Sequence, residues 1–164
     1  MPVSYTDDEI DALVGEGKRL PRDWEDRTRL KAKRGHDEQF LEFTGDAGTR
    51  FRLILRQSRV SSLDFSVILA VLVPQSTQVF RLRRYNGRSH EHTNQIEKEM
   101  FYDFHIHFAT ERYQELGARE DAYALPTDRY ATFRGALDCL LKDANFSVPP
   151  KAQGELFDPV GGRR

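Results

Sequence analysis

The chain has 164 residues, of which 31% are charged and 38% are hydrophobic, and its formal net charge is −1. This length suits one domain with a single core, and no apolar run approaches the ~20 residues that a membrane-spanning helix needs. The acidic start, Thr6-Asp7-Asp8-Glu9, lacks the basic and apolar regions of a signal peptide, and the lone Cys139 excludes an internal disulfide. We therefore expect a cytoplasmic protein without a membrane partner.

The first predicted element is a short helix within an N-terminal segment, residues 1–37. Thr6 and Glu9 have the spacing of a capping box, and Ile10 and Val14 belong to a small apolar face. A basic stretch follows, because eight basic residues and only three acidic ones lie between Lys18 and Arg34.

Five strands are predicted next, at residues 39–44, 51–57, 63–73, 78–85 and 101–108. In the second segment, Phe51, Leu53 and Leu55 alternate with arginines, as in a strand with one buried face. Residues 38–146 are expected to form a single α+β domain. Its predicted architecture is an antiparallel β-sheet meander of about five strands with helices packed on one face.

Two helices are predicted near the end of this domain. The first, 109–116, stops at Gly117, and the second is longer and capped by Thr127. Tyr130 and Leu137 belong to the apolar stripe of the second helix. The remaining residues, 147–164, are rich in proline and glycine and are expected to form a disordered C-terminal tail.

A histidine cluster is the strongest indication of chemistry in the sequence. Four of the five histidines lie within eighteen residues, as two His-x-His pairs: His90 with His92, and His105 with His107. Histidine exchanges protons near neutral pH and is the commonest metal ligand. Because His105 and His107 are two apart on a predicted strand, their side chains should point to the same side.

Arginines on neighbouring strands favour a nucleic-acid ligand for this cluster, since a basic surface attracts phosphate. The sequence predicts a metal-independent ribonuclease in which His105 and His107 act as acid and base and arginine stabilises the charge on phosphorus. His90 and His92 would assist them. The expected nucleic-acid-binding residues are Arg52, Arg56, Arg81, Arg83, Arg84, Tyr85 and Asn86.

Two other interpretations of the histidines remain open. The same four side chains, with Asp103 or Glu97 in reserve, offer enough ligands for zinc or another divalent transition metal. In the ribonuclease interpretation no cofactor is needed. In the structural interpretation the histidines are hydrogen-bonded at a strand end, where Asp103 would hold one of them.

The run Arg84-Tyr85-Asn86-x-x-x-His90-x-His92, followed by His105-x-His107, resembles the TumE-like toxins of bacterial toxin–antitoxin modules. In those proteins an arginine/asparagine motif after a strand leads into a histidine-rich segment. The resemblance covers residues 78–113, and the proline-containing histidine run typical of the family is missing. It implies a bacterial toxin that acts on RNA and has an antitoxin protein as its partner.

The tail carries a second motif, Gln153-Gly154-Glu155-Leu156-Phe157, which resembles bacterial sliding-clamp-binding peptides. Such a peptide needs an accessible backbone, the Gln153 amide as a polar anchor, and Leu156 and Phe157 to fill an apolar pocket. This motif predicts a non-enzymatic replication inhibitor or adaptor that binds the DNA polymerase sliding clamp. Alternatively, Leu156 and Phe157 pack on the protein's own sheet.

Overall fold

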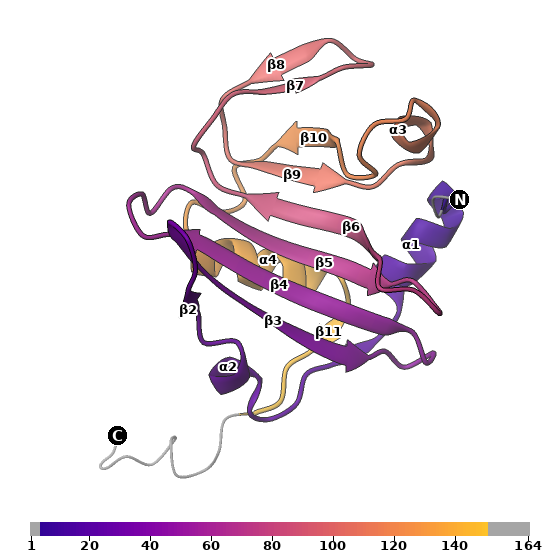
Figure 1. Ribbon diagram of the computed structural model, residues 1–164, viewed down its shortest axis with the longest axis vertical. Helices are drawn as coiled ribbons and strands as arrows, with labels where there is room; N and C mark the ends of the chain where they lie inside the picture. Colours follow the sequence, from indigo (N-terminus) through magenta and orange to yellow (C-terminus); the bar gives the residue numbers. More distant parts are fainter. Residues whose placement is uncertain (1–3, 151–164) are drawn as a thin grey trace.

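The computed structural model describes residues 4–150 and has a seven-stranded antiparallel sheet at its centre (Figure 1). The strand order is β10-β9-β6-β5-β4-β3-β2. The predicted α+β class, an antiparallel meander with helices on one face, is confirmed. The clamp-binding residues expected in the tail, Gln153, Leu156 and Phe157, lie outside the described residues.

Four of the predicted strands correspond to the long strands of the meander, and the fifth prediction, 101–108, is divided between two short strands. The sheet also gains β10, which the sequence did not indicate because it has only four residues and ends in a proline. The strands of the sheet are β2 (Lys31–Ala32), β3 (His36–Thr44), β4 (Arg50–Ser58), β5 (Phe65–Leu72), β6 (Val79–Asn86), β9 (His105–Phe108) and β10 (Tyr123–Pro126).

Helix α4 (Phe133–Asp143) lies behind the sheet in Figure 1, where its apolar side joins the core. The alternating residues Phe51 and Leu53 of β4 are fully buried in that core, as predicted. The cap of α4 is Thr132 rather than Thr127, because the Thr132 hydroxyl accepts a hydrogen bond from the Gly135 amide at 2.9 Å. No helix within residues 4–150 is long and apolar enough to cross a membrane.

The N-terminal segment belongs to the same core as the sheet. Helix α1 (Asp7–Gly15) has the predicted capping box of Thr6 and Glu9, and buries Ile10 and Val14. The short helix α2 (Trp24–Arg27) adds the indole of Trp24. The N-terminal segment therefore shares its core with residues 38–146.

Segments near the two ends of the described chain pack around the buried side chain of Lys18. Strand β1 (Lys18–Arg19) pairs in parallel with β11 (Phe146–Ser147). The ammonium group of Lys18 lies 2.7–3.0 Å from the carbonyl oxygens of Leu13, Val14, Glu16 and Ala144, which share its three N–H donors. These carbonyls lie at the C-terminal ends of α1 and α4, where helices leave acceptors unpaired. Burial lowers the pKa of Lys18 to about 8.

A β-bulge in β6 decides which arginines face the open side of the sheet. Leu69 of β5 pairs with Arg83 and Ala70 pairs with Arg81, so that one residue of β6, Leu82, has no partner. Arg81 therefore faces the open side, as do Arg84 and Asn86 further along the strand. Arg83, which was predicted to bind nucleic acid together with Arg81, does not share its face, because the extra residue turns Arg83 towards the helix-covered side.

Candidate metal centre

Strands β6 and β9 bring a row of polar side chains onto the open face. In their antiparallel register His105 lies opposite Asn86, and His107 lies opposite Arg84. The prediction that His105 and His107 share one face is confirmed. Both imidazoles are buried, with exposed fractions of 0% for His105 and 4% for His107.

A β-hairpin brings a third histidine to this pair. Strands β7 (His92–Asn94) and β8 (Glu99–Phe101) form the hairpin, which stands beyond β9 and β10 in Figure 1. The buried Asn94 amide fixes the hairpin to β10, because it donates to the Ala124 carbonyl at 2.7 Å and accepts from the Ala124 amide at 2.9 Å. The same Asn94 oxygen lies 2.9 Å from Nε2 of His92. Since that oxygen is an acceptor, Nε2 of His92 donates, and Nδ1 keeps its lone pair.

The three imidazoles of His92, His105 and His107, here called the histidine centre, each have one ring nitrogen within 4.8 Å of the others. Their ring centroids are 4.9 Å apart for His92–His107 and His105–His107, and 5.5 Å apart for His92–His105. His90 is exposed, and its ring centroid lies 6.0 Å from that of His105. The two sequence pairs therefore form a cluster of three with a fourth histidine at its rim.

Backbone carbonyls fix the tautomers of the two buried histidines. Nδ1 of His105 lies 2.8 Å from the Asp103 carbonyl oxygen, and Nδ1 of His107 lies 2.7 Å from the Asp121 carbonyl oxygen. A carbonyl only accepts, so both Nδ1 atoms carry hydrogen, and both Nε2 atoms have free lone pairs. Asp103 thus holds a histidine as one interpretation expected, but through its backbone. This arrangement is the usual one for metal-binding histidines, whose second nitrogen donates to a carbonyl or carboxylate.

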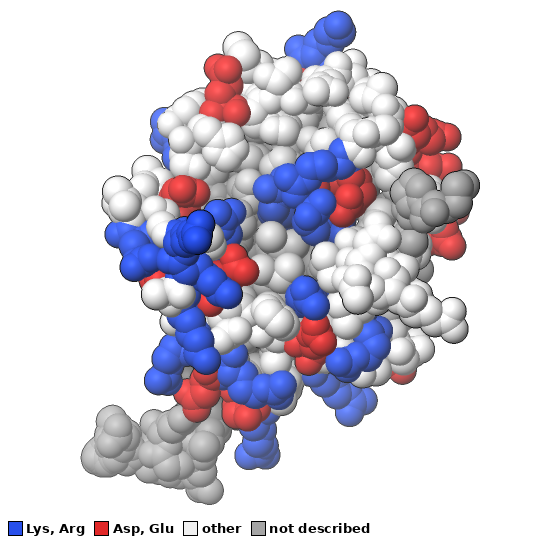
Figure 2. All heavy atoms as spheres, viewed as in Figure 1, with Lys and Arg blue, Asp and Glu red and all other residues white. Residues whose placement is uncertain are grey.

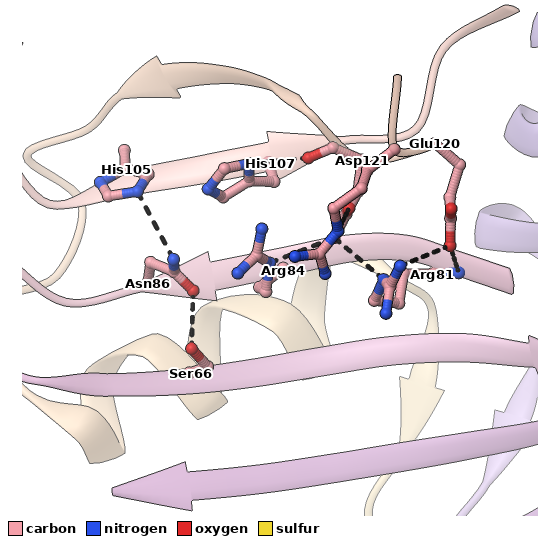
Figure 3. A network of polar contacts seen from close by, with 9 residues as sticks. Ser66, Arg81, Arg84, Asn86, His105, His107, Glu120 and Asp121 are labelled. Carbon is pink, nitrogen blue, oxygen red and sulfur yellow. Dashed lines mark hydrogen bonds and ion pairs between the residues drawn. The ribbon is translucent and has the colours of Figure 1, made fainter. Parts of the chain in front are cut away.

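Asn86 contributes a weak contact to the centre. Its side-chain oxygen accepts from the Ser66 hydroxyl at 2.9 Å, which turns its nitrogen towards Nε2 of His105 at 3.5 Å (Figure 3). A hydrogen bond of this length is weak. The lone pair of His105 is therefore still available to a ligand.

Burial keeps the two strand histidines neutral at physiological pH. It lowers the pKa of His105 to about 4 and that of His107 to about 2. The positive charge of Arg84 is the second cause of the low pKa of His107. Neither imidazole carries the extra proton that a general acid must supply near pH 7, whereas neutral imidazoles are the form that binds metals.

Beside the histidine centre, three arginines surround one buried carboxylate, that of Asp121 (Figure 3). Nε of Arg84 donates to Asp121 at 3.1 Å, Nε of Arg81 lies 3.5 Å from the same oxygen, and Nε of Arg119 lies 3.6 Å from the other oxygen. Arg81 also pairs with Glu120 at 3.2 Å. These five residues form the arginine cluster, whose three positive and two negative side chains leave a net charge of +1.

A cleft of about 570 Å³ is lined by His92 and His107 of the histidine centre and by Arg84 and Arg119 of the arginine cluster. Arg84 and His107 come from the sheet, and His90 and His92 come from the segment that follows β6. The opposite wall is formed by α3 (Glu111–Glu115) and the loop after it, which carries Arg119. The volume is that of a small-molecule site.

The other predicted nucleic-acid-binding residues lie away from this cleft. On β4, Arg52 pairs with Glu42 at 2.5 Å and Arg56 lies 4.0 Å from Glu38, so acidic side chains of β3 offset their charges. Figure 2 shows such acidic residues interleaved with the basic groups of this face. On the helix-covered side, Tyr85 is fully buried and its hydroxyl donates to Asp143. Arg83 donates to that hydroxyl at 3.3 Å.

Three residues of the arginine cluster were not expected from the sequence: Arg119, Glu120 and Asp121. The sequence feature that could have indicated them is the charged triplet Arg119-Glu120-Asp121, which lies between the helix stop at Gly117 and strand β10. A charged triplet in a loop is ordinarily a solvated turn. Only the three-dimensional packing shows that Asp121 is buried.

The chain matches no family model, and no curated protein or solved structure matches it. The resemblance to TumE-like toxins, and the RNA and antitoxin partners that it implies, therefore remain predictions.

Proposed function

We propose that the protein is a metal-dependent hydrolase in which His92, His105 and His107 bind a divalent transition metal such as zinc. One observation carries this proposal: each of the three imidazoles has a ring nitrogen within 4.8 Å of the others. In each ring one nitrogen is bonded to an oxygen acceptor, which leaves the lone pair of the other for a metal. Zinc–nitrogen bonds of about 2.1 Å place tetrahedral ligand atoms roughly 3.4 Å apart. A bound ion would therefore require the ligand nitrogens to move closer together than their present spacing of up to 4.8 Å.

The set of ligands suits a catalytic metal better than a structural one. Catalytic zinc sites have three protein ligands and leave the fourth position to water or substrate, whereas structural sites use four protein ligands. Here three histidines converge, and His90 is at the rim. The metal would lower the pKa of a bound water to about 7 and so supply hydroxide near neutral pH.

Hydrolysis at this site divides into attack and proton transfer. His92, His105 and His107 would hold the metal, which would supply a hydroxide for attack on an ester, and the oxygen that leaves when the ester bond breaks would need a proton. His90, an exposed imidazole beside the centre, is positioned to exchange that proton with solvent. Arg84, at the floor of the cleft, would stabilise negative charge that develops on the substrate.

The metal-independent ribonuclease expected from the sequence has less support. That mechanism requires one protonated and one neutral histidine at the same time. The pKa values of about 4 for His105 and about 2 for His107 leave both imidazoles neutral at pH 7. The two strand histidines are therefore better suited to bind a metal than to act as an acid–base pair.

Metal analysis of the purified full-length protein tests the proposal. We expect about one zinc per chain, or a Co²⁺ complex with the visible absorption of a four-coordinate site. His105→Ala and His107→Ala should lose metal binding. His36→Ala is the matched control, because His36 lies on β3 and contacts Glu38, away from the centre. Equal metal binding by the His105→Ala variant would contradict the proposal.

An RNA-degradation assay separates the two enzymatic hypotheses. Cleavage that persists in chelator, and is lost in His105→Ala, would favour the metal-independent ribonuclease. Cleavage that stops in chelator and returns with zinc would support a metal-dependent hydrolase that acts on RNA.

A second candidate function rests on the sequence of the tail. The Gln153-to-Phe157 motif supports binding to a bacterial sliding clamp, and this role needs no chemistry at the histidine centre. Leu156→Ala combined with Phe157→Ala should abolish clamp binding and growth inhibition in cells. His105→Ala combined with His107→Ala should leave clamp binding intact. The reverse pattern would show that the histidine centre is responsible for the effect in cells.

A further inference from the structure

The charge of the cleft raises a question about how a metal binds there. The three imidazoles bring no negative charge, and the adjacent arginine cluster has a net charge of +1. A divalent ion would raise the local charge to +3. In a partly buried site such like charges repel strongly, unless an anion accompanies the metal.

The positions of Arg84 and Arg119 indicate where that anion would bind. Both line the cleft that also contains His92 and His107. Figure 3 shows the Arg84 guanidinium between His107 and Asp121. Arg84 is mostly buried, with 18% of its side chain exposed, and Arg119 reaches the cleft from the opposite wall with 56% exposed.

The geometry of these groups favours a tetrahedral anion with several free oxygens. A metal on one side and two guanidinium groups on the others provide three separate points of attachment, and arginine binds phosphate through paired N–H groups. A terminal phosphate has three such oxygens and carries a charge near −2, which offsets the charge of the metal. A carboxylate has two oxygens and half that charge.

We propose that a terminal phosphate group of a small molecule completes the metal centre, contacts Arg84 and Arg119, and binds cooperatively with the metal. This inference rests on the metal-dependent function proposed above. It assigns the substrate class as phosphate monoesters, and it makes the arginine cluster the specificity-determining part of the site. The cleft volume of about 570 Å³ accommodates a molecule of nucleotide size.

The test is a titration of the full-length protein with Co²⁺, followed by visible absorption, with and without inorganic phosphate. Because coupling between two ligands is reciprocal and typically 5–150-fold, phosphate should tighten Co²⁺ binding by about tenfold. Acetate and dimethyl phosphate, each a monoanion, should have smaller effects. A nucleoside 5′-monophosphate should reproduce the effect of phosphate if the cleft takes an organic ester.

Two arginine variants test whether the arginine cluster couples phosphate binding to Co²⁺ binding. Arg119→Gln should reduce the effect of phosphate and should tighten Co²⁺ binding in its absence, since it removes a repelling charge. Arg134→Gln is the matched control, because it removes the same charge from α4 on the other side of the sheet. The control should keep the full effect of phosphate.

The possible failures are distinguishable. A wild-type protein that binds no Co²⁺ contradicts the proposed function itself. A protein that binds Co²⁺ with the same affinity in the presence and absence of phosphate overturns this inference alone. An effect of acetate or dimethyl phosphate as large as that of phosphate overturns the assignment of a terminal phosphate, as does full coupling in Arg119→Gln.

Discussion

Asn94 determines the position of His92, although it is not itself a candidate ligand. Ala124 lies on the edge strand β10, and its backbone N–H and C=O groups form hydrogen bonds with the Asn94 side chain instead of with a further strand. The Asn94 oxygen also accepts a hydrogen bond from His92. The Asn94 side chain therefore joins the hairpin that carries His92 to β10. Partners of this kind orient metal ligands and fix their tautomers.

Replacing Asn94 with alanine should weaken metal binding without removing a ligand. We expect a loss of roughly 10–100-fold in affinity, which is typical for the hydrogen-bond partners of metal ligands. Co²⁺ titration measures it. Met100→Ala, an exposed residue of the same hairpin, serves as control and should keep wild-type affinity. Unchanged affinity in Asn94→Ala would show that the hairpin is positioned by other contacts.

The buried histidines should make the metal-free protein sensitive to acid. Burial lowers the pKa of His105 from 6.5 to about 4, so below pH 6.5 the unfolded chain takes up a proton that the folded chain refuses. Stability should therefore be full above pH 6.5 and fall as the pH decreases towards 4, by up to about 3 kcal/mol. His107 acts in the same direction. Urea unfolding in chelator at several pH values measures this, and His105→Gln should show a shallower decline.

The sequence predicts part of the site because strand periodicity is a local property. His105 and His107 are two apart on a strand, which is enough to place them on one face. The contact of His92 with them depends on Asn94 meeting β10, and nothing near Asn94 in the chain indicates that contact. The position of Arg83 depends on a bulge, and one extra residue reverses the face of every later side chain.

At the scale of elements, the turn after β6 controls where the histidine segment begins. Gly87 donates from its backbone to the Phe65 carbonyl at 2.9 Å, and an added Cβ would collide with the backbone carbonyl of Leu63. The close approach of two backbones explains the glycine at this position. Residues 88–92 continue from this point towards the histidine centre.

Gly87→Ala should destabilise the protein by about 1–3 kcal/mol, because the backbone of Leu63 must move. Gly15→Ala is the matched control, since no atom lies within 4 Å of its added Cβ and its position ends α1. That variant should be neutral or slightly more stable. Urea unfolding compares the two, and equal stability of both variants would contradict this account of the turn.

The elements that the sequence predicts well are those with long regular patterns. The alternation of Phe51, Leu53 and Leu55 identifies β4, and the capping box identifies α1. The start of α4 is less determined, because Thr127 and Thr132 both satisfy the rule for a helix cap. The structure selects Thr132, whose hydroxyl meets the amide three residues on. Tyr130 then precedes the helix, and the carbonyls of Asn86 and His105 share the single hydrogen of its hydroxyl.

At the scale of the whole molecule, Lys18 connects the N-terminal segment with the end of α4. Replacing it with methionine keeps most of the side-chain volume but leaves four carbonyls without their donor. We expect a loss of about 2–4 kcal/mol in the free energy of unfolding. Lys142→Met, at an exposed position of α4, should change it little. Thermal and urea unfolding measure both, and a neutral Lys18→Met would show that water replaces the ammonium group.

The contacts between Lys18 and the end of α4 also determine when the N-terminal segment can fold during translation. Ala144 lies 126 residues after Lys18 in the chain, and β1 has no partner until β11 has been made. On the ribosome β1 therefore lacks its strand partner, and Lys18 lacks the Ala144 carbonyl, until translation has passed residue 147. Chains released early keep this junction open and expose core residues to proteases. The junction thus restricts the native state to chains whose synthesis has reached the tail.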